Sequence, residues 1–242
     1  MVNPNVSLRG YLWKLISRYA NIKMYKKQLD ILEEWKSPNR KEAIDKGATF
    51  FKLVEASFKR TMLVELSLFV NEKEQVNIYD WLNKAKEHSK SLKPTKANKD
   101  KNIKKSRVLL KDTYYKKVIN KHVKKLSSHN DIIKNLIAHR DKILSHYDSS
   151  YFNRPKTVYK KYAIDILELN NLMKTIEDIL SKHHSYLFES SIASFDVSSY
   201  TNVNMILTYT RAFSRIRKDK GLIIGKGFRP ADYLKEIFPE KK

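Results

Sequence analysis

Apolar residues recur every three or four positions over long stretches of this 242-residue chain, and this spacing limits how the chain can fold. Such a period places apolar side chains on one side of an α-helix, whereas a half-buried strand alternates every second residue. Only 5 Gly and 6 Pro interrupt the pattern. The sequence therefore predicts an all-α fold, a bundle of about five to seven helices with long antiparallel core helices and a basic surface.

Short polar or proline-containing breaks separate the expected helices. Ser127, Ser128 or Asn130 is placed to cap the helix that follows them, because short polar side chains accept hydrogen bonds from free backbone amides. We expect a bundle over residues 1–195, which includes an exposed Lys-rich linker at 90–105, and a basic helical extension over 196–242. The expected helices cover about residues 8–35, 41–70, 78–88, 106–125, 130–148, 162–188 and 203–220.

Several classes of site and location are excluded or disfavoured by the composition. The chain has no Cys, which excludes disulfides, thiolate zinc sites and cysteine nucleophiles. The first residues show no signal-peptide pattern, and the longest apolar stretch, Met62 to Val70, is short and contains Glu65. We expect a cytoplasmic protein with no membrane partner, with binding to an anionic lipid surface as the less favoured alternative.

The positive charge points to a polyanionic partner. There are 49 Lys and Arg residues against 26 Asp and Glu, a formal charge of +23. Residues 90–125 alone contain 14 basic residues against two acidic ones, which gives a local charge of +12. Nucleic acid is the commonest partner for such a surface. A solvated charge run without a specific partner, or an acidic protein partner, also fits this composition.

The densest group of residues with chemical potential is the segment from Lys134 to Asp148. On a continuous helix at about 100° per residue, His139 and His146 lie almost on one stripe, with Lys142 between them. Arg140 lies about 100° from His139. Without further information, an ordinary amphipathic surface helix explains the same pattern.

Residues of this segment resemble the HEPN superfamily of nucleotide-binding helical proteins, and specifically its U-type abortive-infection branch. The resemblance covers roughly residues 1–190. It is carried by Asn135, by the run Ala138-His139-Arg140-Asp141-Lys142, by the five residues between Arg140 and His146, and by an upstream stretch from Ser57-Phe58-Lys59-Arg60 to Trp81-Leu82.

The resemblance implies a helical bundle that forms a homodimer and, in many members, cleaves RNA without a metal or other cofactor. A histidine with a pKa near neutrality can accept the proton of a ribose 2′-hydroxyl or protonate the leaving oxygen. An arginine can stabilise the charge that develops on the phosphorus centre. A two-fold dimer would supply a second set of these groups.

Two alignments of the motif remain open. In the first, Arg140 and His146 are the catalytic pair and Asp141 is the polar residue after the arginine. In the second, Lys134 takes the place of the arginine and His139 is the catalytic histidine. The first is favoured, because lysine lacks the bidentate fork of arginine. The residues expected to hold RNA are Lys134, Lys142, Arg107, Lys116, Lys117 and Lys121.

The leading hypothesis is thus a metal-independent endoribonuclease that acts in abortive-infection phage defence or as a toxin. The alternative is a non-catalytic nucleic-acid-binding subunit of a larger defence complex. An antitoxin or another defence protein is a further expected partner. The ribonuclease requires an accessible Arg140 beside a motif histidine. An Arg140 held in internal ion pairs, with both histidines covered by the core, contradicts it. We expect His183 and His184 to be exposed at a helix end, and not to bind a metal.

Overall fold

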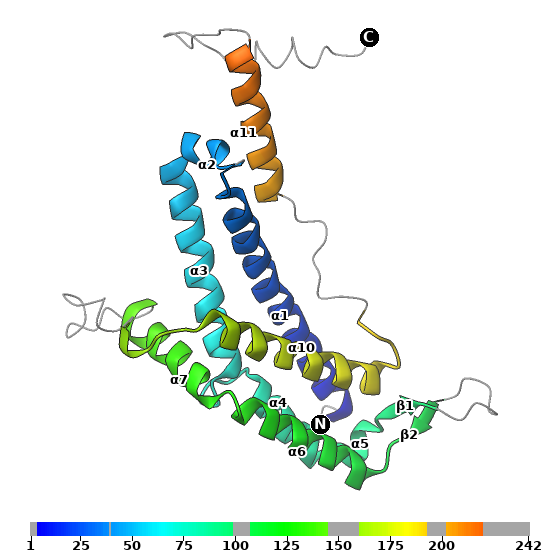
Figure 1. Ribbon diagram of the computed structural model, residues 1–242. Helices are drawn as coiled ribbons and strands as arrows, with labels where there is room; N and C mark the ends of the chain where they lie inside the picture. Colours follow the sequence, from blue (N-terminus) through cyan, green and yellow to red (C-terminus); the bar gives the residue numbers. More distant parts are fainter. Residues whose placement is uncertain (1–3, 39, 99–106, 145–159, 193–201, 220–242) are drawn as a thin grey trace, which may run out of the picture. The chain divides into compact units, whose positions relative to one another are not determined.

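The computed structural model describes residues 4–38, 40–98, 107–144, 160–192 and 202–219. Helices make up most of this part of the chain (Figure 1). The only strands among these residues are β1 (Thr95–Ala97) and β2 (Arg107–Leu109), which form one antiparallel pair. The prediction of an all-α fold is confirmed.

The chain divides into two compact units. The larger contains the described parts of residues 1–30 and 52–200, and the smaller those of 31–51 and 201–242. The sequence placed a boundary near residue 195 and assigned residues 31–51 to the bundle. The structure instead groups 31–51 with the C-terminal helix. The long helices α1 (Pro4–Trp35) and α3 (Ala48–Val70) contribute residues to both units.

The smaller unit contains α2 (Glu42–Lys46) and α11 (Asn202–Asp219) with the adjoining ends of α1 and α3. Trp35 donates a hydrogen bond of 2.9 Å from its Nε1 to Asn204 Oδ1, and Leu207 is fully buried. The helix expected over residues 41–70 is divided at Gly47. A Cβ at Gly47 would lie 3.1 Å from the Phe51 ring, so glycine allows the close approach found here.

The larger unit is built around an apolar core to which its main helices all contribute. Its later helices are α4 (Ile78–Glu87), α5 (Ser89–Leu92), α6 (Asp112–Ser127), α7 (Asn130–His139) and α10 (Ile166–Phe188). A π-helical turn, η1, spans Arg140–Leu144 directly after α7. Helix α6 lies against α4, α5 and α10. Fully buried core residues include Leu12, Leu66, Trp81, Ile119, Leu136 and Ile176.

The segment expected to be an exposed linker contains ordered elements. Leu92 of α5 is fully buried, and β1 pairs with β2. The Pro94 carbonyl accepts a hydrogen bond of 2.7 Å from the Leu110 amide, which fixes the entry to α6. Consequently α6 begins at Asp112, six residues later than the apolar spacing predicted.

The start of α7 differs from the expectation as well. His129 occupies the N-cap position and makes no side-chain capping bond, so neither Ser127, Ser128 nor Asn130 caps this helix. Helix α10 begins at Ile166, where Asp165 accepts from the Glu168 amide as a conventional N-cap. Among the described helices, none is both long enough and apolar enough to cross a membrane.

Candidate functional site

The motif histidine His139 lies at the end of α7 and faces the core. Only 4% of it is exposed, and its Nε2 donates a 2.6 Å hydrogen bond to the Tyr162 carbonyl. Burial lowers the pKa of His139 below its usual value, although the bond to Tyr162 opposes this shift. His139 is therefore a neutral side chain with an internal partner.

Arg140 is held by two carboxylates. Its Nη1 lies 2.8 Å from Glu74 Oε1 and its Nε lies 2.7 Å from Asp141 Oδ1. The Arg140 side chain is only 12% exposed. Because one cation faces two anions, this group has a net negative charge and does not by itself attract a phosphate.

The structure brings only part of the expected catalytic set together. Arg140 contacts Asp141, while His139 has its own partner at Tyr162. Lys142 is half-buried on η1. His146 lies outside the described residues. Two observations were expected to contradict a ribonuclease: an internally paired Arg140 and two motif histidines covered by the core. Arg140 is internally paired. Of the two histidines, His139 is shown to be covered.

The π-helical winding of η1 changes the geometry expected for the motif. The stripe shared by His139 and His146 assumed about 100° per residue, and a π-helix adds a residue to each turn. The winding begins at Arg140 itself. Short π-helical segments within α-helices are frequently found at functional sites, so the winding of η1 is compatible with a functional role of this segment.

Helix α6 presents a basic stripe to the solvent. Its buried residues Tyr115, Ile119 and Leu126 fix the rotation of the helix. The opposite face exposes four residues separated by three, four and three positions, which therefore lie in one row along the helix. We call this row the α6 stripe; its members are Tyr114, Lys117, Lys121 and Lys124.

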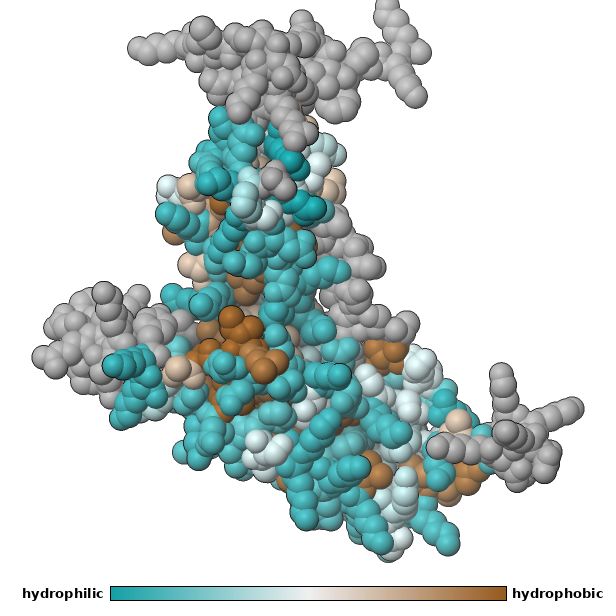
Figure 2. Space-filling view, viewed as in Figure 1, coloured by the Kyte–Doolittle hydropathy of each residue, from teal (hydrophilic) through white to brown (hydrophobic). Residues whose placement is uncertain are grey.

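The three lysines of the α6 stripe make no ion pair with any other described residue. The neighbouring lysines do: Lys116 lies 3.1 Å from Asp112, and Lys125 lies 3.0 Å from Asp178. Lys116, expected to hold RNA, is thus partly neutralised. Mainly hydrophilic residues cover the part of the surface shown over α6 in Figure 2.

The two tyrosines of α6 have different environments. Tyr114 is 45% exposed, whereas Tyr115 is fully buried. A base can therefore stack on Tyr114 and not on Tyr115. On α7, Lys134 is 75% exposed and lies 3.7 Å from Asp131, so it remains accessible to a phosphate.

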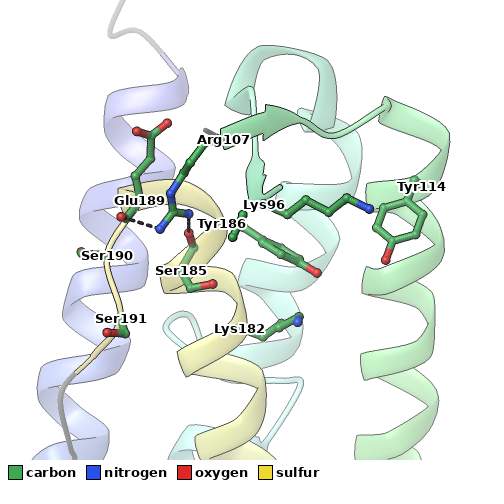
Figure 3. Close-up of a pocket in the computed structure, with 10 residues that line it drawn as sticks. Lys96, Arg107, Tyr114, Lys182, Ser185, Tyr186, Glu189, Ser190 and Ser191 are labelled. Atoms are coloured by element: carbon green, nitrogen blue, oxygen red, sulfur yellow. Dashed lines mark hydrogen bonds between the residues drawn. The ribbon is translucent and has the colours of Figure 1, made fainter. Parts of the chain in front are cut away.

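A cavity of about 740 Å³ lies between the β1–β2 hairpin, the start of α6 and the end of α10 (Figure 3). We call it the hairpin cavity. Arg107 donates to the Ser185 carbonyl at 2.8 Å and to the Glu189 carbonyl at 2.5 Å. The other basic residues that line the hairpin cavity are Lys96 and Lys182. They were not predicted as site residues, because no sequence pattern joins positions so far apart.

A family model described as AbiU2, of the HEPN group, matches residues 7–206 of the chain. The chain belongs to the HEPN AbiU2 family. This membership confirms the resemblance noted from the motif and associates the chain with abortive infection. No curated protein and no solved structure matches it.

This AbiU2 family member also contains a buried chain of hydrogen bonds. Tyr115 Oη lies 2.9 Å from His183 Nδ1, and His183 Nε2 lies 2.9 Å from His122 Nδ1. Burial lowers the pKa of His122 to about 4, with Lys125 and Lys121 adding to the effect. Complete burial likewise lowers the pKa of His183 well below its usual value, with His122 and Lys182 adding to the effect. Both histidines are neutral, which suits a structural role.

The expectation that His183 and His184 are exposed is wrong. They are 0% and 3% exposed, because α10 turns both rings toward neighbouring helices. His184 stacks on Phe188, and its Nδ1 donates to the Ser190 carbonyl at 3.1 Å. Within the described residues, no group of three or more potential metal ligands comes together.

Proposed function

We propose that this abortive-infection protein acts by binding RNA along the α6 stripe. The observation that carries the proposal is the row of three lysines that have no carboxylate partner among the described residues, in line with the exposed ring of Tyr114. Each free lysine can neutralise one phosphate and release its counterions. An exposed aromatic ring next to such a row adds a platform for an unpaired base.

The dimensions of the stripe suit a short single-stranded segment. Ten residues separate Tyr114 from Lys124, a distance of about 15 Å along the helix axis. Bases of single-stranded RNA are available for stacking, whereas those of a duplex are covered by their neighbours. This favours single-stranded RNA over a duplex as the ligand.

The motif segment offers much less positive charge. Arg140 is compensated by Glu74 and Asp141, and His139 is buried. For a phosphate to bind Arg140, it would have to displace a carboxylate. The described geometry thus supports binding through α6 better than cleavage at the motif.

Metal-independent RNA cleavage is the second candidate, and the π-helical turn that begins at Arg140 favours it. Here Arg140 would exchange one carboxylate for the reacting phosphate. His146 would transfer the proton, because His139 already donates to Tyr162. Asp141 would keep the guanidinium oriented through its contact with Nε.

RNA affinity of charge-matched variants tests the binding proposal. The triple variant Lys117→Ala, Lys121→Ala, Lys124→Ala removes the stripe lysines. The control variant Lys41→Ala, Lys46→Ala, Lys52→Ala removes three exposed lysines elsewhere and changes the net charge equally. We expect the stripe variant to bind a single-stranded RNA at least about tenfold more weakly than the control. Equal affinities of the two variants would refute the proposal.

Cleavage of a mixed RNA pool in EDTA tests the second candidate. The proteins compared are the wild type and the variants Arg140→Ala, His146→Ala and His139→Ala, each checked for helical content by circular dichroism. A nuclease of this kind leaves cyclic phosphate ends, and these should disappear in Arg140→Ala and His146→Ala. RNA that stays intact with every protein would leave binding as the function.

A further inference from the structure

We propose that the hairpin cavity is a binding site for a nucleoside phosphate, either a free nucleotide or the phosphorylated end of an RNA. The site is separate from the motif segment and shares only Tyr114 with the α6 stripe. It does not depend on RNA binding by the stripe lysines. Its support comes from the charges, the aromatic rings and the size of the cavity.

Charge is the first argument. Lys96, Arg107 and Lys182 line the cavity, and Glu189 is the one acidic residue among the lining residues. Neither lysine forms an ion pair with another described residue. The Glu189 carboxylate lies on the side of Arg107 away from both lysines (Figure 3). The surplus of positive charge inside a concave surface favours a ligand with phosphate groups.

The setting of Arg107 is the second argument. Its guanidinium is fixed by two backbone carbonyls at the C-terminal end of α10, and not by a carboxylate. The hydrogen bonds orient the group, and no described carboxylate forms an ion pair with it. A planar guanidinium held in this way is suited to bidentate contact with phosphate oxygens.

Aromatic rings hold the two lysines in place. Lys96 Nζ lies 5.1 Å from the centroid of the Tyr114 ring, and Lys182 Nζ lies 5.1 Å from that of Tyr186. Such cation–π contacts restrict the long side chains before a ligand arrives, which reduces the entropy lost on binding. The exposed part of the Tyr114 ring is available to a base.

Size and polarity agree with a nucleotide. A volume of about 740 Å³ falls within the range of small-molecule sites. The hydroxyl groups of Ser185, Ser190 and Ser191 also line the cavity (Figure 3) and supply donors and acceptors for a ribose or a phosphate. A cavity for a purely apolar ligand would not be lined in this way.

Isothermal titration of the full chain tests the proposal, with AMP, ATP, adenosine and inorganic phosphate as probes. We expect AMP and ATP to bind more tightly than adenosine or phosphate alone. The variant Lys96→Ala, Lys182→Ala should weaken ATP binding by about tenfold or more, since two charged contacts are lost. The control Lys41→Ala, Lys46→Ala carries the same change in net charge and should bind as the wild type does.

A second variant separates base stacking from charge. Tyr114→Leu should weaken AMP binding much more than the binding of inorganic phosphate. The base loses its stacking platform, whereas the phosphate loses only the restraint that the ring places on Lys96. An equal loss of affinity for AMP and for inorganic phosphate would contradict the stacking role. Because Tyr114 is exposed, folding should be retained, and circular dichroism checks this for every variant.

Competition identifies the source of the ligand. A short RNA with a 5′-phosphate that displaces ATP, when its 5′-hydroxyl counterpart does not, identifies an RNA end. ATP binding that neither RNA affects identifies a free nucleotide. No binding of AMP or ATP by the wild type, or equal binding by the Lys96→Ala, Lys182→Ala variant and its control, overturns the proposal. The stripe variant that tests RNA binding should keep its affinity for ATP, so the two proposals fail independently.

Discussion

Arg140 and Glu74 lie 66 positions apart in the sequence and form an ion pair of 2.8 Å. Glu74 Oε1 also accepts a hydrogen bond of 3.2 Å from Asn71 Nδ2 in the turn between α3 and α4. The pair therefore connects the motif segment to a turn early in the larger unit. Arg140 acts as a structural link in the described state, whatever it does when RNA is present.

Removing either partner of this pair should destabilise the protein. The contact is mostly covered, since the two side chains are 12% and 35% exposed. We expect Arg140→Ala and Glu74→Ala each to lower the free energy of unfolding by about 1–3 kcal/mol, between the values for surface and buried ion pairs. Urea denaturation measures the change, and a double-mutant cycle isolates the pair.

The control for this measurement is Lys134→Ala. Lys134 is 75% exposed and lies 3.7 Å from Asp131, so its loss should cost less than about 0.5 kcal/mol. If Arg140→Ala unfolds as readily as the wild type and instead loses RNA affinity, then Arg140 contacts RNA and is not a structural link.

The salt dependence of RNA binding should identify the α6 stripe. For single strands, the slope of log affinity against log salt changes by about 0.7 for each phosphate neutralised. Loss of Lys117, Lys121 and Lys124 should thus flatten the slope by about 2. Filter binding at several salt concentrations measures it. A slope unchanged from that of the wild type means that the RNA lies elsewhere.

Much of the fold follows from the spacing of apolar residues. Helices α4 and α10 were predicted within a few residues of their observed bounds, because each has a wide buried face. The β1–β2 pair was missed, since β1 lies in a lysine-rich stretch and its partner is ten or more residues away. Short strands that depend on such pairing leave no periodic signal in the sequence.

The candidate sites show what a one-dimensional pattern omits. The motif located Arg140 and His139 correctly on one helical segment, but their partners Glu74 and Tyr162 come from distant turns. Glu74 helps to neutralise Arg140, and the Tyr162 carbonyl accepts the hydrogen bond of the buried His139. The hairpin cavity likewise depends on Lys96 and Lys182 meeting in space.

Acid should destabilise the fold through His122. A free histidine has a pKa of about 6.5, whereas burial beside Lys121, Lys125 and Lys182 lowers that of His122 to about 4 despite the nearby Asp178. Between these values the unfolded chain binds a proton that the folded chain does not. Stability should therefore fall as the pH decreases from about 6.5 to about 4, and level off below.

Thermal unfolding across this pH range measures the effect. The variant His122→Asn removes the titrating ring and should have a flatter profile than the wild type. His88→Asn serves as the control, because His88 is exposed. If His122→Asn loses stability with acid as steeply as the control does, then His122 is not a source of the pH dependence.

The adjacent residues Tyr115 and Tyr114 provide a matched pair for testing the buried chain. The distances fit an arrangement in which Tyr115 donates to His183 Nδ1 and His183 Nε2 donates to His122. Tyr115→Phe would leave a buried nitrogen without a donor, at a cost of about 1–3 kcal/mol. Tyr114→Phe changes an exposed ring and should cost less than about 0.5 kcal/mol. Equal effects in denaturant titrations would mean that the buried hydroxyl contributes nothing.

The start of α10 is the surface on which we expect two copies to associate. Ile166 and Leu167 are 69% and 70% exposed, and they closely follow Tyr162, whose carbonyl accepts from His139 on the motif helix. Two adjacent large apolar side chains at this exposure favour burial against a partner. Sedimentation velocity should find a dimer for the wild type and a monomer for Ile166→Lys, Leu167→Lys. The control Met205→Lys, Ile206→Lys changes exposed apolar residues of α11 and should remain dimeric. A monomeric wild type would exclude association. A dimer that survives the changes in α10 would place the interface elsewhere.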